Sequence, residues 1–204
     1  SADSCFAPRV IVSTGGLSRP ETGSTGDALP WLATLGHTIV TPTAALVPVA
    51  VKENAITKRL SGVSLATAGI SLRQAGIVFE KAKGKVLFTH VGLSGPGILN
   101  LSQRIGEGLQ SGVVEILLDL TPGLAKDVLE ETLLDRFTVA PNKHIQNQWA
   151  EIIPGALVTP VLEQAEIDPH TPSHSVTVTM RRKLVATIKS FTLTASHLLG
   201  SDKA

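Results

Sequence analysis

Residues 41–120 alternate short apolar runs with turns that contain glycine, and this pattern restricts the fold more than any other feature of the chain. Short runs rich in β-branched residues and bounded by turn residues are typical of strands. Several such strands in succession predict a small barrel or a compact antiparallel sheet. We expect a turn at Lys83-Gly84-Lys85 and strands within residues 46–51, 70–73, 77–79, 86–89 and 113–118.

One helix is expected to interrupt these strands. Ser94 is a candidate N-cap, and Pro96 stands near the first helical position, where a proline is tolerated. Ile98, Leu101 and Ile105 follow at helical spacing. The spacing predicts that one face of this helix is buried.

Residues 121–190 change to a helical pattern. Four apolar stripes recur at helical spacing, within residues 124–133, 145–153, 157–165 and 180–188. They predict a small helical subdomain at 121–190. A strand then begins at Phe191, and we expect residues 191–204 to leave this subdomain and return toward the first layer of the chain.

Residues 1–40 predict part of an α/β layer. Val10-Ile11-Val12 is a continuous apolar run that ends in Ser13-Thr14-Gly15-Gly16, as a central parallel strand does at its ligand-side turn. A short helix is expected within residues 28–35, with Gly36 as its stop. Because the chain opens almost directly on this strand and its only methionine is Met180, we expect a piece of a longer protein.

The charge balance argues against a nucleic-acid partner. Lys and Arg together number 18 and Asp and Glu 17, which lacks the dense positive charge of a nucleic-acid binder. The cluster at Arg181-Arg182-Lys183 is interpreted as a solvated helix face. No apolar run approaches the ~20 residues of a membrane helix, so no membrane partner is expected. The single cysteine, Cys5, excludes an internal disulfide and favours an intracellular, cytoplasmic protein.

Two glycine-rich stretches are candidate sites, whereas the dinucleotide, phosphate-loop and metal motifs are missing, and no metal is expected. The first stretch contains Thr14, Gly15, Gly16, Gly23, Ser24, Thr25, Gly26 and Asp27. Glycines let a cofactor approach the backbone, and free N–H groups bind phosphate oxygens. A long surface loop explains the same residues.

The second stretch runs from His90 to Gly97 and is a candidate substrate-side wall formed by Gly92, Ser94 and Gly95. A helix start carries unpaired N–H groups that attract anions. Histidine is the side chain most often used for proton transfer near neutral pH, so His90 is the candidate proton-transfer residue. A tight turn, with His90 bonded to a neighbouring carbonyl, explains these residues equally well.

The order of these motifs resembles the aminoacetone-oxidase-like family of bacterial FAD-binding flavoproteins. That family shows ATGGLSYPKTGSTGDGY where this chain has STGGLSRPETGSTGDAL, and LFTHFGLSGPAILNLS where it has LFTHVGLSGPGILNLS. Departures are Arg19 and Glu21 in the first motif, and residues 194–200 in place of a T-G-T-R-G-F-like segment.

The resemblance implies an α+β chain made of three parts. Residues 1–40 would be the edge of a Rossmann-type FAD-binding domain, 41–120 an inserted β-barrel-like domain and 121–190 the helical subdomain. The parent would be a FAD-dependent oxidoreductase acting on a small-molecule substrate. The pyrophosphate fingerprint lies upstream in that family, so the partners would be the N- and C-terminal parts of the chain's own FAD domain. This chain alone is expected not to retain FAD.

Two other functions stay open. A serine hydrolase would use Ser24 or Ser94, although Gly92-Leu93-Ser94-Gly95 lacks one residue of the nucleophile-elbow spacing. A binding module without a cofactor is the other alternative, and the missing fingerprint favours it.

Overall fold

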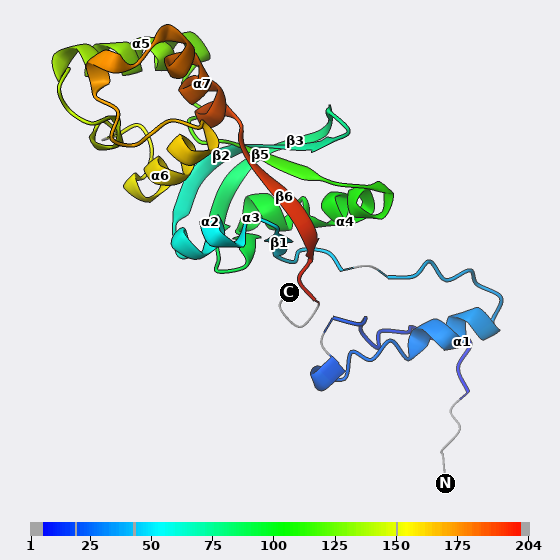
Figure 1. Ribbon diagram of the computed structural model, residues 1–204. Coiled ribbons are helices and arrows are strands. Elements are labelled where there is room, and N and C mark those ends of the chain that lie inside the picture. The colour runs from blue at the N-terminus through cyan, green and yellow to red at the C-terminus, as the bar shows by residue number, and fades with distance from the viewer. Residues whose placement is uncertain (1–5, 19, 43, 150, 201–204) are drawn as a thin grey trace.

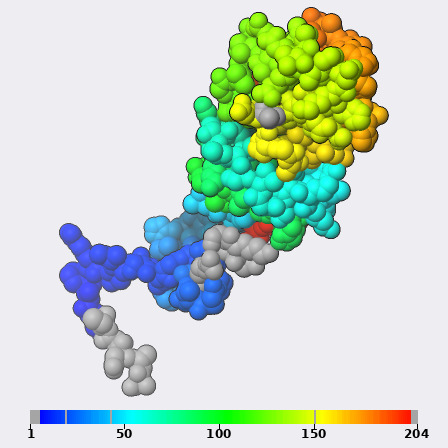
Figure 2. Space-filling model, turned by 90° about the vertical axis from the view of Figure 1, so that its left-hand side faces the viewer, coloured from blue at the N-terminus to red at the C-terminus, as the bar shows by residue number. Residues whose placement is uncertain are grey.

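The computed structural model describes residues 6–18, 20–42, 44–149 and 151–200. Cys5 and Arg19 therefore lie outside the described residues. In Figure 1 a β-barrel stands at the centre, a helical unit covers one end of it, and the N-terminal segment extends from the other end. Figure 2 shows the same order from the side.

Six strands of the described residues form one closed barrel, as the pattern at 41–120 predicted. The spatial order is β1-β4-β3-β2-β5-β6, and every pair of neighbours is antiparallel. The last strand comes from beyond the helical unit, so most of the segment expected to leave the helical subdomain toward the first layer is a strand of the barrel instead. The strands are β1 Val49–Val51, β2 Ser64–Gln74, β3 Ile77–Phe88, β4 Gly92–Ser94, β5 Glu115–Asp119 and β6 Phe191–Leu198.

Side chains that alternate between the two faces of each strand fill the interior of the barrel. Successive side chains of a strand point to opposite faces, so every second residue faces the interior. Ile70 of β2, Leu118 of β5 and Phe191 of β6 are almost fully buried there. On the outer face, Arg73 of β2 binds Glu115 of β5 through Nε and Oε2 at 2.7 Å. This hydrogen bond lowers the pKa of the Glu115 carboxyl.

The turn predicted at Lys83-Gly84-Lys85 is wrong, because these residues lie inside the uninterrupted strand β3. Helix α3 (Pro96–Leu99) packs on β3 at this place. A Cβ on Gly84 would lie 2.9 Å from the Cα of Gly97, so the glycine permits close contact and not a turn. Between the strands expected at 70–73 and 77–79, Ala75 and Gly76 form a tight hairpin turn, with the positive φ angles of 48° and 81° that such a turn requires.

The helix after Ser94 is present but is divided into two. Helix α3 is followed by α4 (Ser102–Ser111), and Ile98, Leu101 and Ile105 are buried as predicted. The N-cap of α3 is Gly95 and not Ser94, which belongs to β4. Gly95 has φ of 91°, a conformation that favours glycine over serine. A further short helix, α2 (Asn54–Arg59), connects β1 to β2.

The helical unit lies between β5 and β6 in sequence. It contains α5 (Lys126–Val139), α6 (Gly155–Gln164) and α7 (Val178–Lys189), with 3₁₀ turns η2 (Ile145–Asn147) and η3 (Ser173–Ser175). The stripe at 145–153 is therefore a 3₁₀ turn and irregular chain instead of an α-helix. Gln164 ties the unit to β6, because its side-chain amide donates to Thr192 O at 2.8 Å and accepts from Thr192 N at 2.9 Å.

The N-terminal segment contains the predicted helix, α1 (Ala28–Thr34), and a 3₁₀ turn, η1 (Pro20–Thr22). The strand predicted at Val10-Ile11-Val12 is wrong, since these residues are extended chain without strand pairing. A strand needs neighbours for its N–H and C=O groups, and the described chain places none beside it. Val10 and Ile11 are 77% and 91% exposed, so no Rossmann layer is visible here.

Candidate functional site

The first glycine-rich stretch folds into a compact loop before α1. Gly15, Gly23 and Gly26 have positive φ angles of 79°, 91° and 77°. A Cβ on Gly15 would lie 2.7 Å from Ser24 Oγ, and one on Gly26 would lie 2.5 Å from Leu17 Cδ2. The two ends of the stretch therefore lie against each other, and the positive φ angles of Gly15 and Gly26 favour glycine at both contacts.

The surface of this loop is open to a ligand. Thr14, Gly15, Gly16, Thr25 and Asp27 are exposed, and nothing lies within 4 Å of a Cβ placed on Gly16. Asp27 occupies the N-cap position of α1 but makes no cap hydrogen bond. Exposed backbone beside glycines fits the close approach that a dinucleotide needs. The loop is thus compatible with the FAD expected from the sequence.

The second stretch forms the hairpin between β3 and β4. Thr89 N donates to Gly92 O at 2.8 Å, and Gly92 N donates to Thr89 Oγ1 at 3.1 Å. His90 stands exposed at the tip, and its ring makes no hydrogen bond to any described residue. The structure thus gives no support to the interpretation of His90 as a residue that bonds a neighbouring carbonyl.

Close backbone packing accounts for the glycines of this hairpin. A Cβ on Gly92 would overlap the carbonyl oxygen of Val49 and lie 2.8 Å from Ala50 Cα. A Cβ on Gly95 would lie 2.8 Å from Lys85 O. The glycines at 92 and 95 therefore have a structural cause whether or not a substrate lies beside them.

The two candidate sites are not joined within the described chain. No hydrogen bond links the loop at 13–27 to the His90 hairpin among the residues that the structure describes. Neither Ser24 nor Ser94 bonds a histidine or a carboxylate there, so the structure offers no support for a serine hydrolase.

A cavity that the sequence did not reveal lies between α4 and β6. It has a volume of about 300 Å³, at the small end of the range for ligand pockets. Gln103, Glu107 and Gln110 line it from one face of α4, and Ser196 and His197 line it from β6. The sequence could not reveal this cavity for two reasons. The polar residues of α4 alone indicate only a solvated helix face, and the β6 residues that complete the lining follow about 90 positions later in the chain.

A β-bulge positions the β6 side of this cavity. Ala50 pairs with His197 and Val51 with Ala195, so Ser196 is the additional residue. Bulges redirect side chains and are common beside active sites. His197 Nδ1 lies 3.2 Å from Ser196 Oγ. Gly106 permits the approach of the strand, because a Cβ there would lie 2.8 Å from Leu198 Cδ1.

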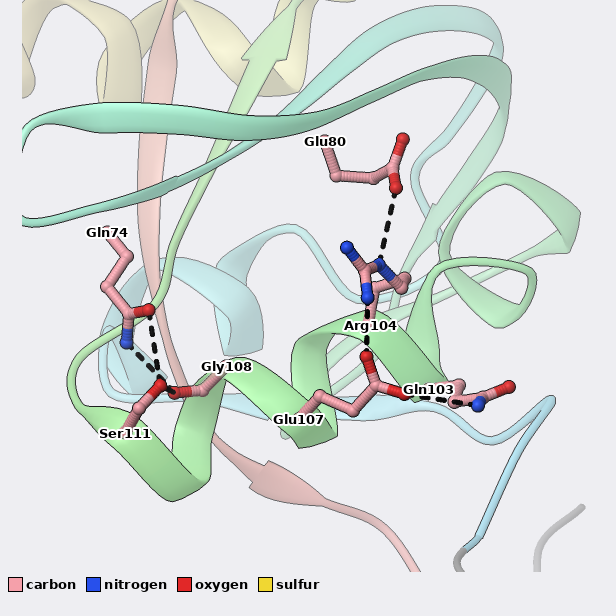
Figure 3. A network of polar contacts seen from close by, with 7 residues as sticks. All are labelled: Gln74, Glu80, Gln103, Arg104, Glu107, Gly108 and Ser111. Atoms are coloured by element: carbon pink, nitrogen blue, oxygen red, sulfur yellow. Dashed lines mark hydrogen bonds and ion pairs between the residues drawn. The ribbon is translucent and has the colours of Figure 1, made fainter.

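The carboxylate of Glu107 is held in place on the opposite wall (Figure 3). Arg104 Nη1 donates to it at 2.6 Å and Gln103 Nε2 at 3.2 Å, while Arg104 Nε reaches Glu80 at 3.4 Å. These carboxylates raise the pKa of Arg104. The cavity therefore combines a hydrogen-bonded carboxylate, amides and an imidazole with the apolar side chains of Ala44, Leu109 and Leu198.

Among the described residues, no cluster of three or more potential ligands could hold a metal ion. The described helices are also too short or too polar to cross a membrane.

This chain is similar to known proteins, including the following three. A 3-dehydro-bile acid delta(4,6)-reductase of Clostridium scindens is 25% identical over 199 residues, which are 97% of this chain and 48% of that protein. A ribosomal RNA dihydrouridine synthase of Haemophilus influenzae is 30% identical over 156 residues, 76% and 36% of the two chains. The Escherichia coli protein of the same description is 25% identical over 180 residues, 88% and 42%.

This chain spans less than half the length of each of these relatives. Residues 43–204 match a family model described as HI0933-like protein barrel and H2TH domain. The match begins just before the barrel and includes the helical unit. The chain therefore belongs to the HI0933-like family and carries its barrel and H2TH domain.

Proposed function

We propose that this chain is part of a FAD-dependent oxidoreductase, of the aminoacetone-oxidase-like kind that its motifs resemble. The observation that carries the proposal is the folded glycine loop. In this loop Gly15 packs against Ser24 and Gly26 packs against Leu17, and the backbone beside these contacts is exposed. Thr14, Gly16, Gly23, Thr25 and Asp27 complete the surface that would hold FAD.

The names of the relatives support a reaction class. One is a reductase of double bonds in a 3-dehydro-bile acid, and the others make dihydrouridine from a uridine in ribosomal RNA. Both kinds of substrate contain a carbon–carbon double bond conjugated to a carbonyl group. We assign the same chemistry to the protein that contains this chain, namely the two-electron reduction of such a bond.

The residues of the barrel would supply the proton. Bound reduced flavin would supply the hydride for the β-carbon, and an external two-electron donor would have to reduce the oxidised flavin again. The α-carbon needs a proton, and we assign this donation to His90, whose side chain is exposed and makes no hydrogen bond to a described residue. Gly92, Ser94 and Gly95 would form the wall beside it. After each turnover His90 regains its proton from solvent.

The remainder of the FAD domain is the proposed intramolecular partner. Phe6, Val10, Ile11 and Val40 are apolar and exposed on the N-terminal segment. Burial of such side chains is favourable by about 1.5–3 kcal/mol each. The relatives contain additional chain that would cover them, in a cytoplasmic enzyme with a small-molecule substrate.

The glycine loop predicts the effect of Gly16→Val in the longer protein. Gly16 has no neighbour within 4 Å and no positive φ, so the chain tolerates valine locally. The added side chain would occupy the path of the cofactor and lower FAD occupancy, measured as flavin released per protein on denaturation. Gly123→Val is the control, since Gly123 has equal space in the helical unit. Equal occupancy in both variants would remove the loop from the flavin site.

The reaction class predicts which compounds reoxidise the reduced flavin. Dithionite-reduced longer protein, kept without oxygen, is expected to recover its visible absorbance with cyclohexenone and not with cyclohexanone. His90→Asn should slow this step about 100-fold, as loss of a general acid does. His144→Asn, another exposed histidine in the helical unit, should not slow it. Equal rates with both ketones would contradict the reaction class, and an unchanged rate in His90→Asn would contradict the role of His90.

A further inference from the structure

The cavity between α4 and β6 lies where the chain enters the barrel and where it leaves it. Ala44 belongs to the segment that leads into β1, and Ser196, His197 and Leu198 belong to β6, the last strand. Helix α4 forms the opposite wall. Three parts of the chain that are far apart in sequence therefore enclose one space of about 300 Å³. The proposed flavin chemistry makes no use of this space.

Hydrogen bonds fix the walls of this cavity relative to one another. Val47 N donates to Ser102 Oγ at 3.3 Å, which ties the segment before β1 to the first turn of α4. Leu199 N donates to Pro48 O at 2.9 Å, which ties the chain after β6 to the same segment. The cavity is therefore formed before a ligand arrives, and a preformed site avoids the cost of ordering its walls on binding.

The carboxylate of Glu107 has vacant positions for two more hydrogen-bond donors. Its Oε1 accepts from Gln103 Nε2 and its Oε2 accepts from Arg104 Nη1, which is one bond to each oxygen (Figure 3). An ionised carboxylate has about four acceptor positions, so each oxygen can accept one further bond. Arg104 also balances the charge of Glu107, so the ligand does not need to be a cation.

The other lining groups combine hydrogen-bonding atoms with an apolar surface. The side chain of Gln110 has no hydrogen bond within the described part of the chain, so its amide can both donate and accept. His197 uses Nδ1 for its contact with Ser196 Oγ, which leaves Nε2 for a ligand. Leu109 and Leu198 add apolar side chains. No lysine or arginine lines the cavity among the described residues, so an anionic ligand would lack an ammonium or guanidinium partner.

We infer that this cavity binds a small neutral molecule with two neighbouring hydroxyl groups on an apolar carbon frame, as in small polyols and monosaccharides. Two adjacent O–H groups can donate to the two vacant positions of the Glu107 carboxylate, and hydrogen bonds to an ionised acceptor are among the stronger ones. The C–H face of such a molecule can cover the two leucines. The inference does not depend on the proposed flavin chemistry, because every lining residue belongs to this chain and the test needs no flavin.

Titration of this chain with three matched probes, followed by NMR, tests the inference. The imidazole signals of His197, assigned by their loss in His197→Leu, report occupation of the cavity. We expect a saturable shift of these signals with cis-cyclohexane-1,2-diol. Cyclohexanol has the same ring and one hydroxyl group fewer, so it should bind about tenfold more weakly, because it loses one hydrogen bond to a charged group. Cyclohexylamine replaces the diol by a cation and should bind no more tightly than the diol.

Glu107→Gln should weaken binding of the diol about tenfold, because the side chain keeps its shape but loses the charged acceptor. The variant is expected to stay folded, since the side chains of Glu107 and Arg104 are 47% and 51% exposed and such a pair contributes little to stability. Glu131→Gln is the matched control. It removes the same charge from an exposed residue of α5, in the helical unit, and should bind the diol as the unmodified chain does.

Four results would overturn the inference. The first is the absence of a saturable shift with the diol. The second is equal affinity for the diol and cyclohexanol, which would reduce the cavity to an apolar contact. The third is tighter binding of cyclohexylamine, which would make the cavity a cation site. The fourth is unchanged affinity in Glu107→Gln, which would place the diol elsewhere. Preference for the diol, together with its loss in Glu107→Gln and not in Glu131→Gln, supports the inference.

Discussion

Replacing Lys189 with methionine is expected to lower the free energy of unfolding by about 3 kcal/mol, because it leaves a partly buried carboxylate without its cation. Lys189 ends α7, and its side chain is only 10% exposed. Its Nζ lies 2.7 Å from Asp119 Oδ2 and 2.8 Å from both Thr121 O and Leu124 O. An ammonium group has three donors, and all three are used here.

Urea denaturation of this chain measures the loss, with Lys183→Met as the matched control. Lys183 lies on the same helix and pairs with Glu166, but both side chains are largely exposed. Exposed pairs contribute at most about 1 kcal/mol. If the two variants lose the same stability, Lys189 joins the helical unit to the barrel no more strongly than a surface ion pair would.

Gly92→Ala is expected to cost at least 3 kcal/mol or to prevent folding. The new methyl group would overlap the carbonyl oxygen of Val49 and press on the Cα of Ala50. Both atoms belong to the backbone of β1, which pairs with β4 at this residue. A flexible side chain could move away, but here two barrel strands would have to separate, which costs more than ordinary overpacking.

The control is Gly123→Ala, for which a Cβ meets no atom within 4 Å. This change should alter stability by less than about 0.5 kcal/mol. A Gly92→Ala protein with unchanged stability would contradict the close packing of β1 and β4. Because the expected effect is on folding, activity lost in this variant would not assign Gly92 to the substrate wall.

The barrel was predictable from the sequence because its signals are local. Apolar runs, glycine turns and period-two alternation indicate strands one at a time, and the inward residues Ile70 and Leu118 follow from that alternation. The interior of β3 was not predictable. A glycine between two lysines predicts a turn. Gly84 instead lies inside β3, and its lack of a side chain is explained by close contact with Gly97 of helix α3, which the local sequence does not reveal.

The candidate site was less accessible to sequence reasoning. The strands predicted at 77–79 and 86–89 are parts of one strand, β3, whose continuity through Gly84 was not expected. The cavity beside α4 needs His197, which reaches it through a bulge that no local pattern signals. Val10-Ile11-Val12 failed for a different reason: apolar character predicts burial, but a strand forms only where other strands are present to pair with it.

The position of the helical unit has a consequence for how the barrel folds. About 70 residues separate β5 from β6, yet Leu118 pairs directly with Phe191. Ordering these residues as a flexible chain would impose an entropic cost of loop closure that delays a barrel built from distant contacts. We expect a helical unit that forms from local contacts to bring the ends of β5 and β6 together before the barrel closes. On this expectation, the rate at which the barrel closes depends on a segment that contributes none of its six strands.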